Sequence, residues 1–498
     1  MMMRYLYEHA AERPDHTAVV YRDERIGFAE LVERIERLAA GLADRGIGPA
    51  DAVALLLPND PFFVISWHAV TALGAIVVPV NPSFKQNEIE FTFRNCDVKA
   101  VISDERTVGV CERIVAGFDR PVEVIPTTAA HGQSLTLDML IENSAGGRLE
   151  ARAPDEVYLY QFSSGSTGRP KRVPRTHAQC VAEGELYNDV FGRDPDDKIF
   201  CAVPMFHTYG MGACLFWNAA SGATMVILED PNPFLLKRHR ALELIEQERA
   251  TVFPGVPFNF RLMAEAPAEA DLSSLRLLFS AGTALPRSSF EAFGERFGLL
   301  VRQLYGSTEA GFMTANLDPD PVGTSESVGK PAGDVEIRIL DDDEQPLPPG
   351  DEGEVVVKSP AMTDGYSDME DLNREAFRDG YFHTGDLGRL DEEGRLYITG
   401  RKKLLIEVGG YKVDPIEVQD VVLAHPKVQE AVVVGAEGRV EGEELVKAVV
   451  VPYDDLDDRE LMEFCRERLA NFKVPQIVEL REEIPKSPLG KVLRKYLV

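Results

Sequence analysis

The chain has 498 residues, of which 44% are hydrophobic and 27% are charged, a length that suits about two to four domains. Its formal net charge is −29, so long-range electrostatics would repel nucleic acids and anionic membrane surfaces, and neither is expected as a partner. Anionic small molecules can still be ligands, because local donors and helix ends act at short range, where the global field is screened over ~8–10 Å.

The sequence shows no export or membrane-spanning segment. Charged residues are spread through residues 1–15, and the most apolar stretch, residues 69–80, is interrupted by Gly74 and Pro79. That stretch is also shorter than the ~20 residues that a transmembrane helix needs. The six cysteines are sparse and show no Cys-x-x-Cys spacing, which favours reduced thiols. We therefore expect a cytoplasmic protein without a membrane span.

Hydrophobic periodicity predicts alternating helices and strands in the N-terminal part. Apolar residues recur at helical spacing over residues 28–42, and Gly46 and Gly48 follow them. The pattern continues with a strand at 53–57, a helix at 61–73 and strands at 76–80 and 100–103. This alternation predicts an α/β fold with layered, mostly parallel sheets.

The C-terminal part has a different pattern, typical of a small α+β unit. Its predicted elements are strands at 431–435, 445–452 and 477–480 and a helix at 458–469. A basic segment, residues 400–403, follows a predicted strand at 396–399, and we place the domain boundary there. The expected domains are a large one over residues 1–400 and a small one over residues 401–498; the family resemblance described below implies that the small one is mobile. Residues 341–352, rich in acids and prolines, are expected to form an exposed loop between strands.

The most informative segment follows a predicted strand and contains six consecutive small residues. They are Ser163, Ser164, Gly165, Ser166, Thr167 and Gly168. Glycines let the backbone turn several N–H groups toward one anion, hydroxyls add donors for phosphate oxygens, and Lys171 adds a positive charge. Pro170 and Arg172 stand where a Walker A loop needs Gly and Ser or Thr, which excludes that motif. By itself, the composition also suits a flexible surface loop.

Further motifs follow in chain order. They are PMFHTYG at 204–210, SAGTALP at 280–286, YGSTE at 305–309, YFHTGD at 381–386, GR at 400–401 and PKSPLGK at 485–491. Together with SSGSTGRPK at 163–171, they closely resemble the motifs of the adenylate-forming (ANL) superfamily, which includes acyl-CoA synthetases, peptide-synthetase adenylation domains and beetle luciferases. The resemblance covers essentially the whole chain. It implies an ATP-dependent, AMP-forming acid:CoA ligase that uses ATP, Mg²⁺ and coenzyme A.

The resemblance implies that the large domain binds ATP and AMP. Tyr305 resembles the ring that stacks on adenine, Asp386 the carboxylate that accepts both ribose hydroxyls, and Arg401 an arginine that contacts ribose. Thr308 resembles a hydroxyl that contacts the α-phosphate, and Glu309 resembles the glutamate that holds Mg²⁺. The implied nucleotide-binding positions are Ser163, Ser164, Gly165, Ser166, Thr167, Gly168, Lys171, Gly282, Thr283, Ala284, Tyr305, Gly306, Ser307, Asp386 and Arg401.

Lys491 resembles the family lysine that reaches from the small domain to bridge the carboxylate of the acid and the α-phosphate. A flexible ammonium with three donors suits this moving charge. His207 resembles the residue beside the acyl carboxylate that helps to open the tunnel for the thiol. The implied catalytic residues are Lys491, His207, Thr308 and Glu309.

The resemblance also implies two catalytic poses of the small domain. Lys403 occupies the position of the family's hinge residue. Residues 407–411 resemble the loop that enters the site for the thioester step, and in it Gly409 and Gly410, beside Tyr411, would let the pantetheine arm pass close to the backbone.

The acid is expected to be a small-molecule carboxylic acid. The resemblance places its acyl pocket near Phe206, Trp217 and Met313, and fatty, aryl and specialised-metabolite acids are all open. Amino-acid adenylation domains have an aspartate where His207 follows Phe206, which disfavours amino acids. The chain ends seven residues after Lys491, so free coenzyme A is the expected acceptor and a separate carrier protein is the alternative. The family resemblance also suggests a homodimer.

Arg172 departs from the family pattern, which usually has glycine at this position. A bulky cation at the exit of the loop would either add phosphate affinity or crowd the triphosphate. The sequence therefore leaves open a variant limited to one half-reaction, either adenylation or thioester formation from supplied acyl-AMP. Two functions of a different class also stay open, a protein that binds a preformed acyl-adenylate and an ATP-binding structural or regulatory module.

Overall fold

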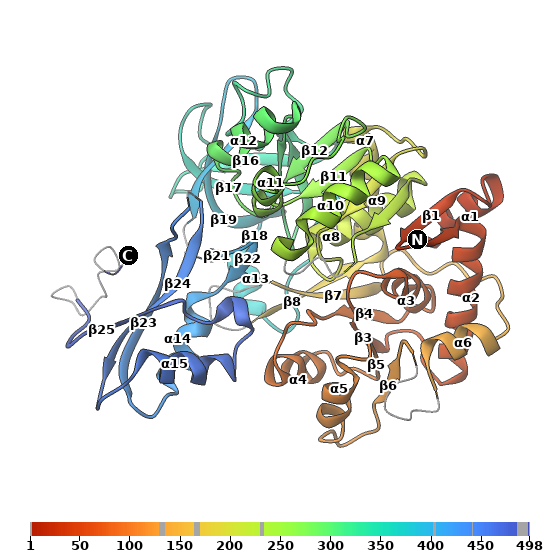
Figure 1. The fold of residues 1–498 in the computed structure, drawn as a ribbon, viewed down its shortest axis with the longest axis horizontal. Helices are drawn as coiled ribbons and strands as arrows, with labels where there is room; N and C mark the ends of the chain where they lie inside the picture. Colours follow the sequence, from red (N-terminus) through yellow and green to blue (C-terminus); the bar gives the residue numbers. More distant parts are fainter. Residues whose placement is uncertain are drawn as a thin grey trace.

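The structure of the protein is a computed structural model that describes residues 2–128, 135–163, 170–229, 234–401, 405–440, 442–485 and Leu497. Figure 1 shows a large α/β part, coloured red through cyan, and a smaller unit, coloured blue, at one side of it. The predicted fold class, α/β with a large N-terminal and a smaller C-terminal domain, is confirmed.

The larger sheet has nine strands among the described residues. Its central strands run parallel, whereas an antiparallel strand closes one edge and two antiparallel strands close the other. In sheet order the strands are β15 (Lys330–Pro331), β14 (Gly311–Ala315), β13 (Arg302–Ser307), β12 (Leu277–Ser280), β11 (Val252–Gly255), β9 (Lys198–Cys201), β10 (Thr224–Ile227), β1 (Thr17–Tyr21) and β2 (Glu24–Gly27).

The second sheet has six strands in the described part of the chain and is parallel except for its last pair. In sheet order they are β6 (Glu123–Pro126), β5 (Ala100–Ser103), β3 (Ala52–Leu56), β4 (Ile76–Pro79), β7 (Val157–Ser163) and β8 (Lys171–Thr176). β7 and β8 pair antiparallel, with Ser163 opposite Lys171. The residues that flank the predicted phosphate loop are therefore held next to each other at one end of this sheet.

Three layers of helices enclose the two sheets. The outer face of the nine-stranded sheet carries α10 (Phe234–Glu248), α11 (Pro257–Ala264) and α12 (Arg287–Phe297). The outer face of the six-stranded sheet carries α4 (Gln86–Asn95) and α5 (Val108–Val115). The central layer contains α1 (Met2–Glu12), α2 (Phe28–Asp44), α3 (Pro61–Ala72), α6 (Leu137–Asn143), α7 (His177–Phe191), α8 (Thr208–Gly210), the π-helical turn η1 (Met211–Phe216) and α9 (Trp217–Ser221).

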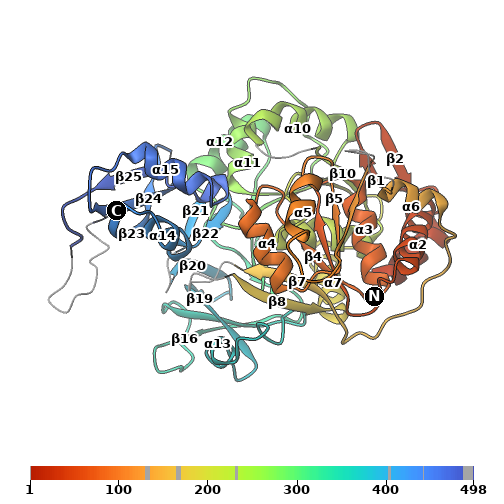
Figure 2. The same ribbon diagram turned by 90° about the horizontal axis from the view of Figure 1, so that it is seen from below.

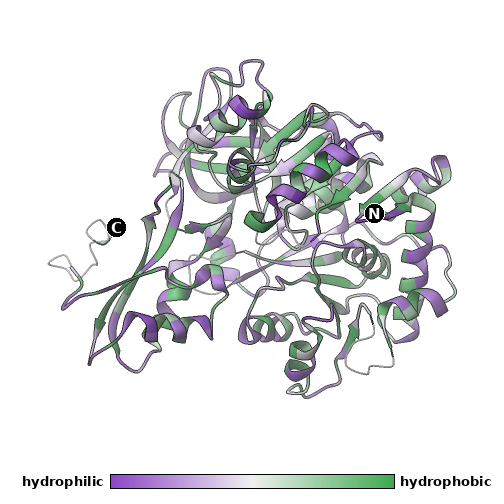
Figure 3. Ribbon diagram, viewed as in Figure 1, coloured by the Kyte–Doolittle hydropathy of each residue, from purple (hydrophilic) through white to green (hydrophobic). Residues whose placement is uncertain are grey.

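Alternation of strand side chains explains this layering. Val19 packs in the central core, whereas the next residue, Val20, packs with the outer helices of its sheet. In the second sheet Leu55 faces the central core and Leu56 faces the α4–α5 side. Figure 3 shows the same distribution, with hydrophobic strands inside and hydrophilic helix surfaces outside. The large domain is therefore a five-layer α/β/α/β/α arrangement around one main core.

Helix ends follow local chemistry. The Asp60 carboxylate accepts a hydrogen bond from the Phe63 N–H at 2.8 Å and Pro61 begins α3, so the helix predicted at 61–73 is capped at its first turn. The helix predicted at 28–42 is α2, and its apolar face is buried. The buried side chains are those of Phe28, Leu31, Val32, Ile35, Leu38, Ala39 and Leu42. The predicted strands near residues 53, 76 and 100 are β3, β4 and β5, with bounds that differ by at most one residue.

A third sheet, which is antiparallel, lies beside the edge of the nine-stranded sheet. Its strands among the described residues are β16 (Glu336–Leu340), β17 (Gly353–Lys358), β19 (Tyr381–Leu390), β18 (Phe377–Arg378) and β20 (Leu396–Arg401), and α13 (Glu370–Ala376) precedes β18. Residues 341–352 form the exposed connection that the sequence predicts between two strands. β20 extends to Arg401, one residue beyond the predicted domain boundary.

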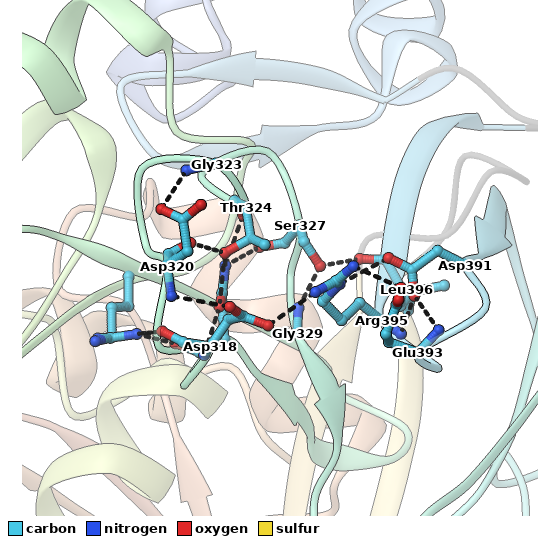
Figure 4. Close-up of polar contacts among 12 residues, drawn as sticks. Asp318, Asp320, Gly323, Thr324, Ser327, Gly329, Asp391, Glu393, Arg395 and Leu396 are labelled. Carbon is cyan, nitrogen blue, oxygen red and sulfur yellow. Dashed lines mark hydrogen bonds and ion pairs between the residues drawn. The ribbon is translucent and has the colours of Figure 1, made fainter.

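A polar clamp fastens this third sheet to the nine-stranded one (Figure 4). Arg395, in the turn before β20, pairs with Asp391 at 2.7 Å and with Asp318, in the segment after β14, at 2.9 Å. The Ser327 hydroxyl donates to the Leu396 carbonyl at 2.8 Å. Gly329 closes the clamp with a φ of +88°, where an added Cβ would lie 1.9 Å from the Ala315 carbonyl oxygen. The clamp therefore fixes β13–β14 relative to β19–β20.

The small domain has its own core. Its described elements are the hairpin β21 (Ile406–Val408) and β22 (Tyr411–Val413), the sheet β23 (Val428–Glu437), β24 (Glu444–Pro452) and β25 (Ile477–Leu480), the helices α14 (Pro415–Leu423) and α15 (Asp458–Arg466), and the 3₁₀ turn η2 (Asn471–Lys473). The strands and the helix predicted from sequence here are confirmed with shifted bounds. One face of the sheet packs on α14, α15 and the hairpin, and the other face packs on Ile484 and Leu497.

The small domain touches the large one through a buried ion cluster. The Lys473 ammonium lies 2.8 Å from Glu88 on α4 and 2.7 Å from Glu417 on α14. Although burial opposes its charge, the two carboxylates raise the pKa of Lys473. Figure 2 shows the hairpin β21–β22 on the side of the small domain that is next to the α11–α12 region of the large domain. The pose of the small domain is therefore fixed by specific contacts.

The predicted absence of a membrane span agrees with the helices of the described residues, because none of them is long and apolar enough to cross a bilayer. All six cysteines lie in the described part of the chain and are buried, unpaired thiols.

The buried pair Arg175–Glu183 tests the packing of β8 on α7. Its charged atoms lie 2.9 Å apart, and the two side chains are 0% and 2% exposed. Glu183→Gln should destabilise the large domain by about 3–5 kcal/mol, because it leaves the guanidinium buried without a counter-charge. Urea unfolding followed by tryptophan fluorescence measures this, since Trp67 and Trp217 both lie in the central core.

Glu33→Gln is the matched control, because it breaks an exposed pair with Arg37 and should leave the unfolding midpoint nearly unchanged. Equal midpoints for Glu183→Gln and the wild-type chain would contradict the assigned role of the buried pair.

Candidate active site

The predicted nucleotide residues meet where the nine-stranded sheet adjoins the third sheet. Tyr305 lies on β13, and the Tyr305 hydroxyl donates to Asp386 on β19 at 2.5 Å. Arg401 lies directly opposite Asp386 on β20, and its Nε is 2.6 Å from the other carboxylate oxygen. Burial and the Asp386 carboxylate raise the pKa of Tyr305 well above its ordinary value, so its hydroxyl remains a donor.

Asp386 is only 4% exposed and is engaged by both neighbours. Burial opposes the charge of Arg401, but Asp386 outweighs that effect, and the pKa of Arg401 is raised. A carboxylate held in this way keeps two fixed oxygens that can accept the hydroxyls of a diol. The geometry therefore brings together the three residues that the sequence relates to adenine and ribose.

A second cluster holds Glu309. The Tyr366 hydroxyl donates to Glu309 Oε1 at 3.0 Å, and the Thr363 N–H donates to the Glu309 carbonyl at 2.8 Å. The Lys171 ammonium lies 4.6 Å from the centre of the Tyr366 ring, a cation–π contact. The lysine at the exit of the phosphate loop and the glutamate expected to hold Mg²⁺ are thus linked through one tyrosine.

Thr308 belongs to a hydrogen-bonded chain that starts on β7. The Gln161 amide donates to the Thr208 hydroxyl at 2.8 Å, and that hydroxyl donates to Thr308 at 3.2 Å. Sequence reasoning missed Gln161, Thr208 and Tyr366. Thr208 stands inside the quoted motif at 204–210, and Gln161 is two residues before the small-residue run, so nearness to motifs was the available signal. The sequence signal for Tyr366 is weaker, because Tyr366 lies outside every quoted motif.

His207 is surrounded by many protein atoms, but solvent still reaches its side chain. Its Nδ1 accepts a long hydrogen bond from the Tyr209 N–H at 3.4 Å. The crowding lowers the pKa of His207, and the ammonium of Lys412 on β22 adds to this effect. His207 is therefore neutral at pH 7.

The loop that follows β12, an interior strand of the nine-stranded sheet, carries Gly282, Thr283 and Ala284. Gly282 has a φ of +89°, a backbone conformation that favours glycine. Gly306 and Ser307 end β13, with Ser307 opposite Gly311 on β14. Because β12 and β13 pair in parallel, this loop follows the strand next to the one that carries Tyr305. The role of these positions in nucleotide binding stays a prediction.

Several predicted residues lie outside the described residues. They are Ser164, Gly165, Ser166, Thr167 and Gly168 of the phosphate loop, Lys403 of the expected hinge, and Lys491. The residues at the two ends of the loop, Ser163 and Lys171, are described. The Ser163 hydroxyl is buried and has no hydrogen-bond partner among the described residues.

Arg172 turns away from the cluster of Lys171, Tyr366 and Glu309. Its guanidinium donates to the Asn95 carbonyl, pairs with Asp368 at 2.6 Å and lies 4.8 Å from the centre of the Tyr160 ring. These contacts join β8 to the end of α4. The two effects considered from sequence, added phosphate affinity and a crowded triphosphate, both require a guanidinium that faces the loop.

The three residues predicted for the acyl pocket differ in their surroundings. Phe206 is partly buried and directly precedes His207. Trp217 is 1% exposed and packs against Tyr187 and Phe191, with ring centres 5.4 Å apart in both pairs. Met313 is fully buried on β14. Trp217 and Met313 therefore belong to the packed core in this structure, and their place in an acyl pocket stays a prediction.

The hairpin β21–β22 reaches the large domain at its tip. Gly409 and Gly410 form the tip with φ values of +57° and +89°. A Cβ added to Gly410 would lie 3.5 Å from the side chain of Val256, the residue before α11. Tyr411 stacks on Phe472 of the small domain at 4.3 Å. The loop that the sequence relates to the thioester step thus lies against the large domain.

Glu309 suits magnesium. Mg²⁺ is commonly held by one or two carboxylates together with substrate phosphates and water. Glu309 is 8% exposed, and Tyr366 engages its Oε1. The described residues contain no cluster of three or more metal-ligating side chains.

Comparison with known proteins identifies the family. The model of the AMP-binding enzyme family matches residues 6–367, and that of the AMP-binding enzyme C-terminal domain matches residues 417–491. The chain belongs to the AMP-binding enzyme family. A long-chain-fatty-acid–CoA ligase from Bacillus subtilis is 30% identical over 529 aligned positions, which cover 99% of this chain and 93% of the relative. The amide bond synthetase McbA from Marinactinospora thermotolerans matches at a TM-score of 0.89 with 30% identity, over 100% of this chain and 98% of the other.

Two structures of one further relative differ in how well this AMP-binding enzyme matches them. A double mutant of o-succinylbenzoate CoA synthetase from Bacillus subtilis, bound to the product analogue OSB-NCoA, gives a TM-score of 0.88 at 29% identity over 99% of this chain and 98% of that one. The same relative in complex with AMP gives 0.72 at 29% identity over 99% and 97%. Because coverage and sequence identity are nearly the same in the two comparisons, the difference in TM-score reflects how the parts of the chain are arranged relative to one another.

Tyr366→Phe isolates the hydrogen bond to Glu309 in this AMP-binding enzyme, because the ring under Lys171 is retained. We expect acid-dependent exchange of pyrophosphate into ATP to fall about 10- to 100-fold, since hydrogen bonds to charged groups contribute about 1.5–3 kcal/mol. The Mg²⁺ concentration for half-maximal exchange should rise. Tyr397→Phe, on the exposed side of β20, is the control, and an unchanged Mg²⁺ titration for Tyr366→Phe would contradict the assignment.

Arg172→Gly restores the residue that is common in the family. Because the guanidinium is engaged by Asn95, Asp368 and Tyr160, we expect pyrophosphate exchange to stay within about twofold of wild type while the melting temperature falls. Lys171→Ala should by contrast lose most exchange. A gain of tenfold or more for Arg172→Gly would show that the side chain restricts the triphosphate.

Proposed function

We propose that this enzyme activates a carboxylic acid with ATP to an enzyme-bound acyl-AMP, releasing pyrophosphate, and then transfers the acyl group to coenzyme A, releasing AMP. The observation that carries the proposal is the convergence of Tyr305–Asp386–Arg401 with Lys171–Tyr366–Glu309 around the C-terminal end of β13. Both family models match, and the fatty-acid ligase relative and the succinylbenzoate synthetase are CoA ligases by name.

In the first half-reaction, a carboxylate oxygen attacks the α-phosphorus and pyrophosphate leaves. Two anions must approach each other, so the chain's task is positioning and neutralisation of charge. Asp386 and Arg401 hold the ribose, and the chain from Gln161 fixes the Thr308 hydroxyl toward the α-phosphate. Glu309 would hold Mg²⁺, which supplies charge neutralisation at the phosphates when bound. Lys171 and Lys491 supply the remaining positive charge.

In the second half-reaction, the small domain presents the hairpin β21–β22 instead of Lys491. The pose described above suits this step, because the glycine tip of the hairpin contacts Val256 and the better match is to a structure with a coenzyme A product analogue. Neutral His207 would stand beside the acyl carbonyl without adding charge. The hinge at Lys403 belongs to the same proposal.

The acid is proposed to lack an ammonium next to its carboxylate, because His207 rather than an aspartate follows Phe206. Relatives that act on fatty and aromatic acids by name leave both classes open. We also propose that the enzyme requires Mg²⁺, is cytoplasmic and forms a homodimer.

Amide formation is a second candidate function, because the amide bond synthetase matches the whole chain at a TM-score of 0.89.

A panel of fatty and aryl acids tests the proposal in two assays. The first is acid-dependent exchange of pyrophosphate into ATP, and the second is formation of AMP and thioester with coenzyme A, or of amide with an added amine. We expect Lys491→Ala to reduce exchange by about 10²-fold or more, while conversion of supplied acyl-AMP by coenzyme A changes little.

Each outcome of the panel favours a different function. Absence of exchange with every acid, with supplied acyl-AMP still converted, would favour a protein limited to the thioester step. Exchange followed by amide but no thioester would favour an amide synthetase. An unchanged Lys491→Ala variant would contradict the role of that lysine in adenylation.

A further inference from the structure

A buried carboxylate outside the nucleotide cluster belongs to a helix that contacts two segments of the site. Glu183 lies on α7, and its side chain is 2% exposed. Its carboxylate lies 2.9 Å from the guanidinium of Arg175 on β8. Arg175 follows Lys171 by four residues on the same strand. The pair therefore ties α7 to the strand that leaves the predicted phosphate loop.

The Glu183 carboxylate also reaches the start of β14. The Phe312 N–H donates to it, and a Cβ added to Gly311 would lie only 2.8 Å from Glu183 Oε2. The carboxylate reaches the π-helical turn η1 as well, because a Cβ added to Gly212 would overlap with Glu183 Oε1. Both approaches are possible only because these two positions lack a side chain. One carboxylate therefore contacts two segments besides β8.

The start of β14 is joined to the glutamate expected to hold Mg²⁺. Glu309 lies in the turn between β13 and β14, two residues before β14 begins. The Thr363 N–H donates to the Glu309 carbonyl at 2.8 Å, and the Thr363 hydroxyl donates to the Pro174 carbonyl at 2.6 Å. Pro174 is next to Arg175 on β8. Two neighbouring residues of one strand thus hold this turn, one through Thr363 and the other through Glu183.

The second segment, η1, continues from a helix that also belongs to the site. It directly follows α8, which begins with Thr208, and the Thr208 hydroxyl donates to Thr308 at 3.2 Å. One turn along α7 from the carboxylate, Tyr187 stacks on Phe312 with ring centres 4.6 Å apart. The helix therefore packs on β14 as well as bonding to its backbone, and it sets η1 and β14 relative to each other.

Stability alone does not account for a charged pair at this place. Burial raises the pKa of Glu183, although Arg175 and the Phe312 N–H favour its charged form. A buried ion pair is often no more stabilising than two apolar side chains of similar volume. A carboxylate, however, can accept hydrogen bonds at both oxygens, which apolar side chains cannot do. The pair therefore suits the positioning of the segments that it contacts.

We propose that Glu183 is a positioning residue of the adenylation step, which holds the turn that carries Glu309 in a fixed place relative to Lys171. The proposal rests on the two-step function above, in which Lys171 and Glu309 act on the phosphates of ATP. Glu183 acts through the start of β14 and through η1 rather than by contact with a substrate. Its loss should therefore disturb the phosphate side of the site and leave the ribose side at Asp386 intact.

Two double variants separate this role from stability in the full-length enzyme. The acceptor-free variant, Arg175→Met with Glu183→Met, removes both charges and leaves the Phe312 N–H without its acceptor. The acceptor-keeping variant, Arg175→Met with Glu183→Gln, also removes both charges but retains an oxygen that can accept this N–H. Neither variant leaves a buried charge unpaired, so both should fold. Tryptophan fluorescence and circular dichroism check this.

The two variants should differ in the first half-reaction. For the acceptor-free variant we expect the kcat of acid-dependent pyrophosphate exchange to fall about 10- to 100-fold, with the KM for the acid nearly unchanged. The Mg²⁺ concentration for half-maximal exchange should rise. The acceptor-keeping variant should recover about tenfold of the lost rate. Conversion of supplied acyl-AMP by coenzyme A should stay within about threefold of wild type in both, because that step involves no triphosphate.

Calorimetric binding of ATP adds a readout that does not depend on turnover. Wild-type enzyme should bind ATP more tightly with Mg²⁺ than with EDTA, because Glu309 is placed to hold the ion. The acceptor-free variant should lose about fivefold or more of this difference, while its affinity for adenosine is retained. A residue that acts on stability alone would leave both affinities unchanged in folded enzyme.

Asp197→Asn is the matched control, because Asp197 is also a buried carboxylate paired with an arginine, Arg276. These two residues precede β9 and β12, whereas the site lies at the opposite, carboxyl ends of β12 and β13. Asp197→Asn should lower the melting temperature without a change in exchange or in its Mg²⁺ requirement.

Wild-type exchange and a wild-type Mg²⁺ requirement in the acceptor-free variant would overturn the proposal. An equal loss of exchange in both double variants, or unfolding of both, would overturn it as well, because the pair would then act through its charge or on stability. Absence of exchange in the wild-type enzyme with every acid would instead contradict the proposed function, and ATP binding would still distinguish the two double variants.

Discussion

The carboxylate of Asp386 connects the two structural units on which the site depends. One of its oxygens accepts the hydroxyl of Tyr305 from the nine-stranded sheet, and the other pairs with Arg401 at the end of the third sheet. A buried carboxylate is stable only with such partners, so the two sheets must stay in register for either of them to be satisfied. The polar clamp around Arg395 fixes that register from the other end of β20. The residues proposed to contact ribose therefore also form the joint between the two sheets.

The acidic character of the chain makes each cation near the site informative. With a net charge of −29, the global field opposes ATP, and the binding free energy must come from a few positive groups at short range. Lys171 is held over Tyr366, and Arg401 is held by Asp386. Arg172 stands in the loop sequence but is engaged elsewhere, by Asn95 and Asp368. The position of a cation in the sequence therefore does not determine which group it neutralises.

Much of the fold could be predicted because its signals are local. The amphipathic pattern of α2 and the short apolar runs of β3 and β5 depend on burial of one face or of a whole strand. The residues proposed to bind the nucleotide could be named from the sequence because they lie within contiguous motifs. Tyr366, Gln161 and Thr208 were missed because their roles arise from contacts across long chain separations, which no periodicity reports. The enclosure of Trp217 and the direction of Arg172 are likewise set by packing partners on other elements.

The sheet of the small domain has two faces that pack against different partners. One face packs on α14, α15 and the hairpin β21–β22, and the other packs on Ile484 and Leu497. The hairpin is on the side turned toward the large domain, because a Cβ added to Gly410 at its tip would lie 3.5 Å from Val256. The two proposed half-reactions differ in charge, because acyl-AMP carries less charge than ATP and because the leaving group is pyrophosphate in the first step and AMP in the second. One arrangement of the small domain cannot be matched to both of these charge distributions, so the two poses proposed for that domain meet the two demands better than one pose would.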